Sequence, residues 1–511
     1  MAHTPTSGAN WPLFACATLA IFVPLAYIHL NDARLKRVPQ SASQFSPKRL
    51  TPEAITALEK QLAEKDTTID DQIPPKTERR YIVVGGAGFL GGWIVLQLIR
   101  RGEDPKNIRV IDLRLPDRPD LQTDEVKDVA FLQVDITDRD AVDRAFDLPW
   151  PKGDTTGLTV FNTAANILFY ERDEKLLPRS IRINVDGSQN LLDASRRVGA
   201  SIFIQTSSGS VSVHSSRYLL WPWEREPKHF VQVINDDEGI IPKRHEDHFS
   251  NYAASKYIWE RRVCAAHNTP SGTGVLRTGA IRPGNGISGP GGDQICGSYL
   301  VRGSNPSWAL HVVQSFVYVE NCSLAHLLYE ARLLAHEDGD HSCADIGGQA
   351  FVVTDPGPPA TYGDIAVALN TLSGGKCTFV RLSPTVMLLI AYLIEALYTT
   401  RLRLQMSGWT WLARMLPHIK GDVAALQPAM CNLVTPHLIF DDSRARLAPE
   451  RGGLGYRGAW TTMEGAVRTH NAYVAGMISP RVRSIEAGPA AAVVDTFKTT
   501  TGVNVMPALS G

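Results

Sequence analysis

The chain has 511 residues, which is enough for one large domain with additional segments and a substantial buried core. Its 52 lysines and arginines balance 52 aspartates and glutamates, so the net charge is zero, and without a basic block we expect no nucleic-acid partner. The seven cysteines are scattered and the histidines show no ligand spacing, so we expect reduced thiols, no disulfide framework and no metal site.

The N-terminus contains an uncharged apolar run over residues 11–30. As an α-helix it would span about 30 Å, the thickness of the hydrocarbon core of a bilayer. Arg34, Lys36 and Arg37 follow the run, whereas no lysine or arginine precedes it as one would in a secretory signal. We therefore predict a membrane anchor over residues 1–38 with the rest of the chain on the cytoplasmic side. A cleaved signal and a buried helix are the alternatives.

A spacer is predicted over residues 39–79. Thr51 and Pro52 are a typical helix start, and apolar residues at helical spacing follow them. We interpret this short helix as part of a solvated stalk, with a partner-binding helix as the alternative. Pro74 and Pro75 then mark a linker.

The most informative stretch is a strand over residues 81–84 followed by Gly85, Gly88 and Gly91. A strand, a tight glycine turn and a helix start place bare amides where the pyrophosphate of a dinucleotide can bind. The next strand ends at Asp112, and an acidic residue there accepts hydrogen bonds from an adenosine ribose and disfavours a 2′-phosphate. The expected cofactor is NAD, with NADP left open by the nearby Arg114.

Short apolar strands alternate with helices from residue 81 onward, which predicts a parallel sheet. The expected fold class is α/β: a doubly wound parallel sheet of the Rossmann type with a smaller C-terminal substrate part. We expect strands at residues 81–84, 108–112, 130–134, 158–162, 202–206 and 275–276.

Tyr252 and Lys256 lie four residues apart, so on a helix they share one face. A neighbouring ammonium favours the phenolate, which makes the tyrosine a usable general base for an alcohol. A solvated helix face is the alternative interpretation. The strand at residues 202–206 ends in hydroxyl side chains, and this supports a catalytic site.

Further motifs follow in chain order: Asp135-Ile136, Asn162-Thr163-Ala164-Ala165, Asn184-Val185-Asp186-Gly187-Ser188-Gln189-Asn190, Thr206-Ser207-Ser208, Ile281-Arg282-Pro283-Gly284-Asn285 and Phe316-Val317-Tyr318-Val319-Glu320-Asn321. With the glycine turn and the Tyr252/Lys256 pair, they resemble the extended short-chain dehydrogenases. Within that group they resemble the 3β-hydroxysteroid dehydrogenase/isomerase family, over roughly residues 80–476.

The resemblance implies roles for individual residues. The catalytic set would be Ser208, Tyr252 and Lys256; Ser208 is preferred to Ser207 because it lies three residues before Val211, as in the family. The cofactor would be bound by Gly85, Gly88, Phe89, Leu90, Gly91, Asp112, Asp135, Ile136, Asn162, Ala164, Ala165, Tyr252, Lys256 and Pro283.

Two segments bear on the substrate side. Residues 218–223 are rich in aromatic side chains, which could line an apolar pocket or pack on the core. An apolar stretch over residues 386–398 is interrupted by Glu395 and, at about 13 residues, is too short to span a bilayer. We expect either a membrane-associated segment at 384–416 or a buried helix. The dehydrogenase domain is predicted over residues 80–480 and a disordered tail over 481–511.

The predicted function is membrane-associated, NAD-dependent oxidation of the 3β-hydroxyl group of a sterol or related triterpenoid. The alternatives are a decarboxylating sterol-4α-carboxylate 3-dehydrogenase, a nucleotide-sugar epimerase or reductase, and an NAD-binding scaffold without activity. We expect an apolar sterol-like substrate and a location in the endoplasmic reticulum membrane, with the catalytic domain facing the cytosol. A homodimer is compatible with the sequence, which leaves the oligomeric state open.

Overall fold

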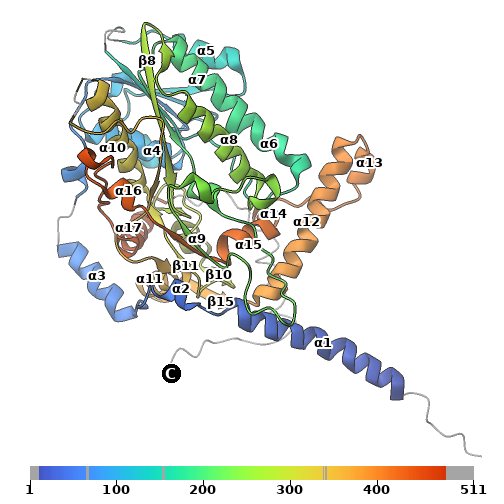
Figure 1. Cartoon of the computed structure of the whole chain (residues 1–511). Helices are drawn as coiled ribbons and strands as arrows, with labels where there is room; N and C mark the ends of the chain where they lie inside the picture. Colours follow the sequence, from blue (N-terminus) through green and yellow to red (C-terminus); the bar gives the residue numbers. More distant parts are fainter. Residues whose placement is uncertain are drawn as a thin grey trace, which may run out of the picture.

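The computed structural model of the chain describes residues 11–478, apart from 65–67, 152, 154–155, 338 and 340–341. The predicted tail at 481–511 lies outside the described residues. Figure 1 shows a central sheet flanked by helices, with the N-terminal helix α1 leaving the body on one side.

A parallel sheet forms the centre of the molecule. Its strands are, in spatial order, β13 (Ala350–Val353), β8 (Gly274–Pro283), β5 (Ile202–Thr206), β4 (Leu158–Asn162), β1 (Arg80–Val84), β2 (Ile108–Asp112) and β3 (Ala130–Gln133), with β7 (Thr269–Ser271) antiparallel to β8. The strand order reverses direction at β1, and ligands of such sheets bind in the crevice outside the carboxyl ends at this point. The predicted Rossmann-type sheet is confirmed.

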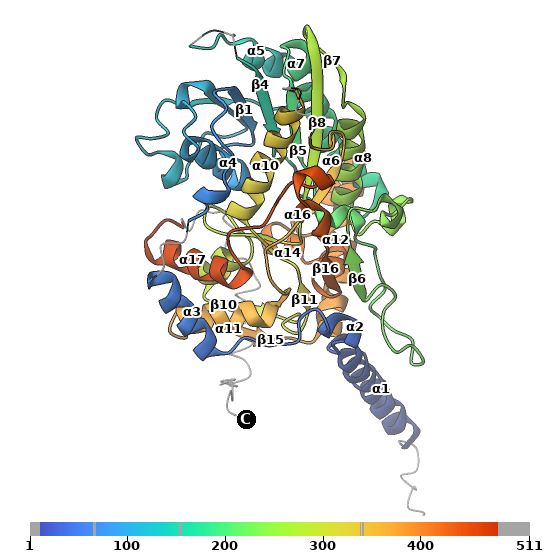
Figure 2. The same cartoon turned by 60° about the vertical axis from the view of Figure 1, so that its left-hand side comes forward.

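Helices cover both faces of this sheet (Figure 2). Tyr81 and Val83 pack into the core on the side of α4 (Phe89–Arg100) and α10 (Val319–Glu337). Ile82 and Val84 pack into the opposite core, with α5 (Arg139–Asp147), α7 (Ser188–Arg197) and α8 (Asn251–Ala265). Because successive side chains of a strand point to opposite faces, β1 reads as a continuous apolar run when both faces are buried.

The C-terminal part adds three small sheets. The largest has the order β14 (Ala360–Thr361), β11 (Val313–Gln314), β16 (His437–Phe440) and β6 (Val231–Ile234); the others are β10 (Ser304–Ser307) with β15 (Thr378–Arg381), and β9 (Ile287–Ser288) with β12 (Val317–Tyr318). The remaining α-helices are α2 (Gln40–Ser43), α3 (Pro52–Glu64), α6 (Leu177–Ile181), α9 (Cys296–Arg302), α11 (Tyr362–Leu372), α13 (Thr410–Ala413), α14 (Gly421–Ala425), α15 (Pro428–Val434), α16 (Ser443–Arg446) and α17 (Thr462–Val474).

The segment predicted to be a solvated stalk packs on the protein instead. The helix α3 forms as expected, but it lies against α11 and α17, and its Ile55 is fully buried in the same core as Ile365. Arg49 pairs with Asp364 at 2.6 Å just before the helix. The stalk interpretation was wrong because a short amphipathic helix has an apolar face that is most stable when another element covers it.

Helix α1 (Trp11–Leu35) is joined to the body only near its C-terminal end. Asn31 is fully buried there and donates to the Oγ1 of Thr385 at 2.9 Å and to the carbonyl of Tyr218 at 3.0 Å. Earlier apolar side chains such as Phe14 and Phe22 are exposed. The segment Phe14–Ser43 is long and apolar enough to cross a membrane.

The second apolar stretch is longer than predicted. Helix α12 (Pro384–Met406) runs for 23 residues and passes through Glu395, which is compensated by an ion pair with Arg172 at 2.6 Å. It too is long and apolar enough to cross a membrane, although part of it is buried in the protein. Glu395, which appeared to interrupt the apolar stretch, is therefore part of one continuous helix and makes an ion pair within the protein.

Candidate functional site

The glycine turn after β1 packs so tightly that side chains would not fit at two of its positions. Gly85 has a φ of +79°, and a Cβ atom there would lie 2.6 Å from the Oγ1 of Thr163. A Cβ atom on Gly91 would lie 2.3 Å from the carbonyl oxygen of Gly85, so the start of α4 packs on the turn itself. Gly88 is the N-cap residue and no side chain caps the helix, which leaves the first amides, at Phe89 and Leu90, for an anion.

An arginine that the sequence analysis did not single out fixes this turn. The buried guanidinium of Arg118 donates to the carbonyls of Gly88 and Phe89, at 2.9 and 2.8 Å, and pairs with Asp120. Nothing in the sequence around Arg118 identifies this role, because the contact joins residues about 30 positions apart. These hydrogen bonds fix the start of α4.

Asp112 lies against the glycine turn, where a nucleotide ribose is expected. Its Oδ2 accepts from the amide of Ala87 and its Oδ1 from the amide of Arg114, both at 3.2 Å. Burial raises the pKa of this carboxyl group, and the two amides act against that shift. The carboxylate is thus fixed at the carboxyl end of β2, beside the turn.

The residues expected near the adenine divide into exposed and buried positions. Asp135 is exposed and accepts from the amide of Thr137 at 2.9 Å. Ile136 is buried, and its Cγ1 lies 2.8 Å from where a Cβ of Gly187 would be. The side chain of Asp135 is therefore accessible to a ligand, whereas Ile136 contributes through packing.

Asn162, expected to line the cofactor channel, turns into the protein. It is fully buried and donates to the Oε1 of Gln205 at 2.8 Å, while its Oδ1 accepts from the amide of Ala164 at 3.2 Å. Ala164 and Ala165 are half-buried, and a Cβ on Gly85 would lie 2.9 Å from the amide nitrogen of Ala164. Asn162 thus shapes the turn that brings these two alanines beside the glycines.

Lys256 connects the catalytic helix with the strand that carries the serine. Its Nζ, almost completely buried, donates to the carbonyl of Thr206 at 2.8 Å at the end of β5. Burial lowers the pKa of Lys256 to about 8, and the negative charge of Glu260 acts in the opposite direction. Tyr252 lies one turn earlier on α8 and is half-buried against the core that contains Phe249.

The two candidate serines differ in accessibility. Ser208 is half-buried, and its Oγ lies 2.7 Å from the Oγ of Ser210. Ser207 is buried, and its Oγ finds no hydrogen-bond partner among the described residues. Pro283 lies at the end of the neighbouring strand β8, with its carbonyl 2.8 Å from where a Cβ of Gly209 would be. Of the two serines that follow Thr206, Ser208 therefore has the more accessible hydroxyl group.

A buried polar layer beneath Tyr252 fixes the orientation of α8. Asn184, in a π-helical turn of the kind often found at functional sites, donates to the Oγ of Ser255 at 2.9 Å. Ser255 in turn donates to the carbonyl of Tyr252 at 2.8 Å, and the Oδ1 of Asn184 accepts from the amide of Asn166 at 2.7 Å. In the sequence Asn184 stands out only as part of a motif, and its contact with Ser255 is what reveals a role.

A buried ion pair extends the same helix face by one more turn. Glu260 accepts two hydrogen bonds from the guanidinium of Arg282, at 2.6 and 2.9 Å, and both side chains are almost completely buried. Glu260 follows Lys256 by four residues, so its charge also acts on the ammonium group. This partnership could have been anticipated from the helical spacing, but its arginine comes from β8.

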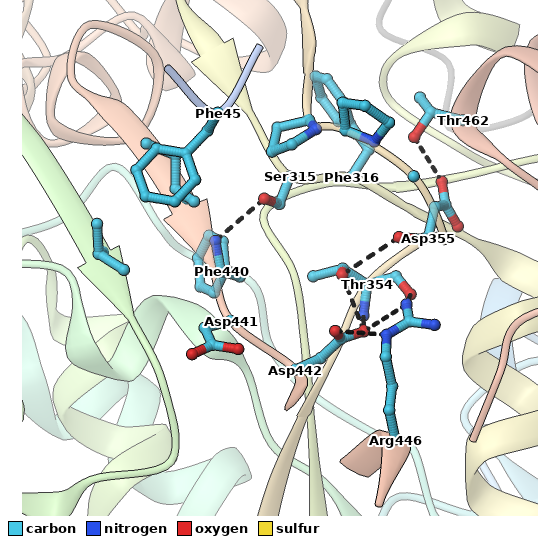
Figure 3. A pocket seen from close by; sticks show the side chains of 15 residues that line it. Phe45, Ser315, Phe316, Thr354, Asp355, Phe440, Asp441, Asp442, Arg446 and Thr462 are labelled. Carbon is cyan, nitrogen blue, oxygen red and sulfur yellow. Dashed lines mark hydrogen bonds and ion pairs between the residues drawn. The ribbon is translucent and has the colours of Figure 1, made fainter. Parts of the chain in front are cut away.

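Two cavities of about 250 Å³ lie in the described part of the chain, and neither is lined by Ser208, Tyr252 or Lys256. The first, shown in Figure 3, is crossed by hydrogen bonds from Thr354 and Arg446 to Asp442, and from Thr462 to Asp355. These contacts join β13, α16 and α17, so we regard this cavity as part of the packing between them. The second lies beside α12.

The chain is similar in sequence to known sterol dehydrogenases. The model of the 3-beta hydroxysteroid dehydrogenase/isomerase family matches residues 82–378. The chain is 26% identical to 3beta-hydroxysteroid-dehydrogenase/decarboxylase isoform 1 of Arabidopsis thaliana, over 78% of this chain and 80% of the relative. It is 27% identical to the decarboxylating sterol-4-alpha-carboxylate 3-dehydrogenase of Schizosaccharomyces pombe, over 57% of this chain and 74% of the relative.

Among solved structures, the fold is similar to that of an epimerase from Methanothermobacter thermautotrophicus. The TM-score is 0.50 at 16% identity, over 81% of this chain and 98% of the epimerase. At this identity the similarity concerns the fold alone. It extends the likeness of the architecture beyond the segment matched by the family model.

Proposed function

Because the chain belongs to the 3-beta hydroxysteroid dehydrogenase/isomerase family, and so is an NAD(P)-dependent oxidoreductase, we propose that it oxidises the 3β-hydroxyl group of a sterol or related triterpenoid. The observation that carries the proposal is the bond from buried Lys256 to the carbonyl of Thr206. It fixes the helix of Tyr252 against the strand that leads to Ser208.

The glycine turn fits a dinucleotide, because Gly85 and Gly91 let the turn, Thr163 and the start of α4 pack without intervening side chains, and α4 begins without a side-chain cap. We propose NAD rather than NADP, since the Asp112 carboxylate beside the turn disfavours a 2′-phosphate. When bound, NAD supplies a nicotinamide ring that accepts a hydride. Gly88, Leu90 and the other residues of the turn would hold its pyrophosphate.

The residues of the chain then handle the proton. Ser208 hydrogen-bonds the oxygen of the substrate and orients it. Tyr252 removes the hydroxyl proton as general base, and the ammonium group of Lys256 favours its phenolate form. Asn184 and Ser255 hold the backbone of Tyr252 in position.

A second candidate function is supported by the names of the two relatives described above, both of which include decarboxylation. On a sterol 4α-carboxylate, the same oxidation gives a β-keto acid. Its carbon–carbon bond to the carboxylate then breaks, the electron pair passes into an enolate, and the enolate takes up a proton. No additional acid or base is required from the protein for this loss of carbon dioxide.

We further propose that α1 anchors the enzyme in a membrane, with the catalytic part on the cytosolic side of the endoplasmic reticulum. The exposed apolar side chains of α1 and the basic residues after it support this orientation. An apolar substrate would then reach the site from the bilayer.

The experiment that separates the two functions uses purified membranes, NAD and a panel of sterols with and without 4α-carboxylates. Formation of NADH with simple 3β-hydroxysterols supports the first candidate. Formation of NADH with equimolar carbon dioxide, restricted to the carboxylates, supports the second. Turnover of nucleotide sugars alone would contradict both.

A further inference from the structure

The second cavity lies between α6, α12 and the segment that leads into α14, and we propose that it binds a phosphate-bearing anion, the headgroup of a membrane lipid. The cavity has a volume of about 250 Å³, enough for a phosphate group with its first substituents. Its polar lining consists of Tyr170, Arg179, Tyr398, Arg401, Gln405, His418 and Lys420. No lining residue is acidic.

Contacts within the protein fix the guanidinium groups of Arg401 and Arg179. Arg401 donates to the carbonyl of Ala413 at 2.9 Å and to that of Leu416, so its guanidinium is fixed by the turn after α13. Arg179 is paired with the buried Glu171, to which Tyr398 also donates at 2.7 Å. A preorganised guanidinium loses little conformational freedom when it binds an anion.

The charge in the cavity is only partly compensated. Glu171 offsets Arg179, but within the described part of the chain no carboxylate lies within ion-pair distance of Arg401 or Lys420. Partial desolvation, followed by the charges of Lys420 and Arg401, lowers the pKa of His418. The fixed guanidinium of Arg401 and the exposed ammonium group of Lys420, next to an imidazole, thus form a site that an anion would complete.

The surroundings of the cavity indicate where the anion comes from. Leu393, Trp411 and Met415 are 61%, 62% and 74% exposed on the same hairpin of α12 and α13 (Figure 1). Apolar and tryptophan side chains exposed together are typical of a membrane interface, where lipid phosphates lie just outside the hydrocarbon. Since α1 packs on the base of α12 through Asn31, both helices can meet the same bilayer.

The tryptophan-rich loop lies beside the C-terminal end of α1. Trp221 and Trp223 stack at 5.4 Å and are 57% and 75% exposed, whereas Tyr218 is buried. Arg34 of α1 donates to the carbonyls of Trp221 and Pro222, at 3.1 and 2.7 Å. Packing on the core, one of the two alternatives predicted for this segment, holds for Tyr218. The two tryptophans are exposed instead, and they add a second interfacial contact beside α1.

The test is calorimetric titration of the full-length chain in a neutral detergent with three probes: inorganic phosphate, a short-chain phosphatidic acid and a short-chain phosphatidylcholine. We expect phosphatidic acid to bind best and Lys420→Gln to weaken it roughly tenfold, the effect of one charged hydrogen bond. Lys60→Gln on the exposed face of α3, on the other side of the molecule, is the matched control and should bind like the wild type.

Each outcome decides the proposal. Equal affinity for inorganic phosphate and phosphatidic acid would keep the anion site and overturn the lipid as its source. No binding of either phosphate probe, an unchanged affinity in Lys420→Gln, or equal binding of phosphatidylcholine would overturn the proposal itself. The proposal rests on the proposed membrane association, but NADH formation is not its readout, so failure of the dehydrogenase function would be recognised separately.

Discussion

The helix of the proposed catalytic residues, α8, and the hairpin of α12 and α13 differ in how the charges around them are compensated. Glu260 of α8 and Arg282 of β8 are buried and paired at 2.6 Å. On the hairpin, cations surround a cavity without an acid and apolar side chains are exposed. In the first region the charges are compensated by other residues of the chain. In the second region they are not, and we expect an external ligand to compensate them.

The largest effect is expected at the proposed general base. Tyr252→Phe should lower the turnover of a 3β-hydroxysterol by about 10²–10⁴, because a general base contributes this much to proton transfer. Tyr257→Phe, on the same helix, is the matched control and should keep its activity. Steady-state NADH formation measures both variants. Near-normal turnover of Tyr252→Phe with NAD binding intact would refute the assignment.

The buried pair should dominate the stability of the catalytic side. Glu260→Ala leaves the guanidinium of Arg282 buried and uncompensated, so we expect a loss of about 3–5 kcal/mol in the free energy of unfolding. Asp247→Ala, which removes the exposed pair with Arg244, should change it little. Denaturant unfolding of the two variants side by side is the measurement, and equal losses would contradict the difference in burial.

A smaller loss is expected where the N-terminal helix α1 joins the body. Asn31→Ala removes the bonds to Thr385 and Tyr218, and the lost buried hydrogen bonds should cost about 1–3 kcal/mol. The effect should be confined to this side of the molecule, so proteolysis near residues 218–223 should increase while NAD affinity stays unchanged. A parallel loss of NAD affinity would show that the two regions are not independent.

The smallest effect is a shift in pH dependence. Burial lowers the pKa of Lys256 to about 8, so its ammonium is present below that pH and is lost as the pH rises through it; turnover should decline there. Glu260→Gln removes the charge that raises this pKa, so the decline should begin at lower pH. A rate profile that is flat across pH 8, or identical in the variant, would contradict this account.

Local patterns predicted the catalytic half well. The strands β1, β2 and β5 and the turn at Gly85 are determined by neighbouring residues, so the sequence indicated them almost to the residue. Contacts between segments that are distant in the sequence could not be predicted in this way. Arg118 behind the glycine turn and Arg282 opposite Glu260 belong to other elements, and no spacing announces them.

The segments α3 and α12 were harder to predict for the same reason. Glu395 looked like the end of an apolar segment because its partner, Arg172, lies 223 positions away. Ile55 looked exposed because the helices that bury it, α11 and α17, come from the C-terminal part. Burial of an amphipathic helix depends on packing that a single sequence does not specify.

Hydride transfer from a sterol carbinol to NAD is the central step of the proposed function, and transfer of an isotope label from sterol to cofactor measures it. The purified chain is incubated with NAD and a 3β-hydroxysterol that carries deuterium on the carbinol carbon. We expect the deuterium in the reduced nicotinamide, with the sterol released as a ketone and no transfer by Tyr252→Phe. Reduced cofactor that carries no deuterium, or a sterol that keeps its label while nucleotide sugars turn over, would contradict the proposed function.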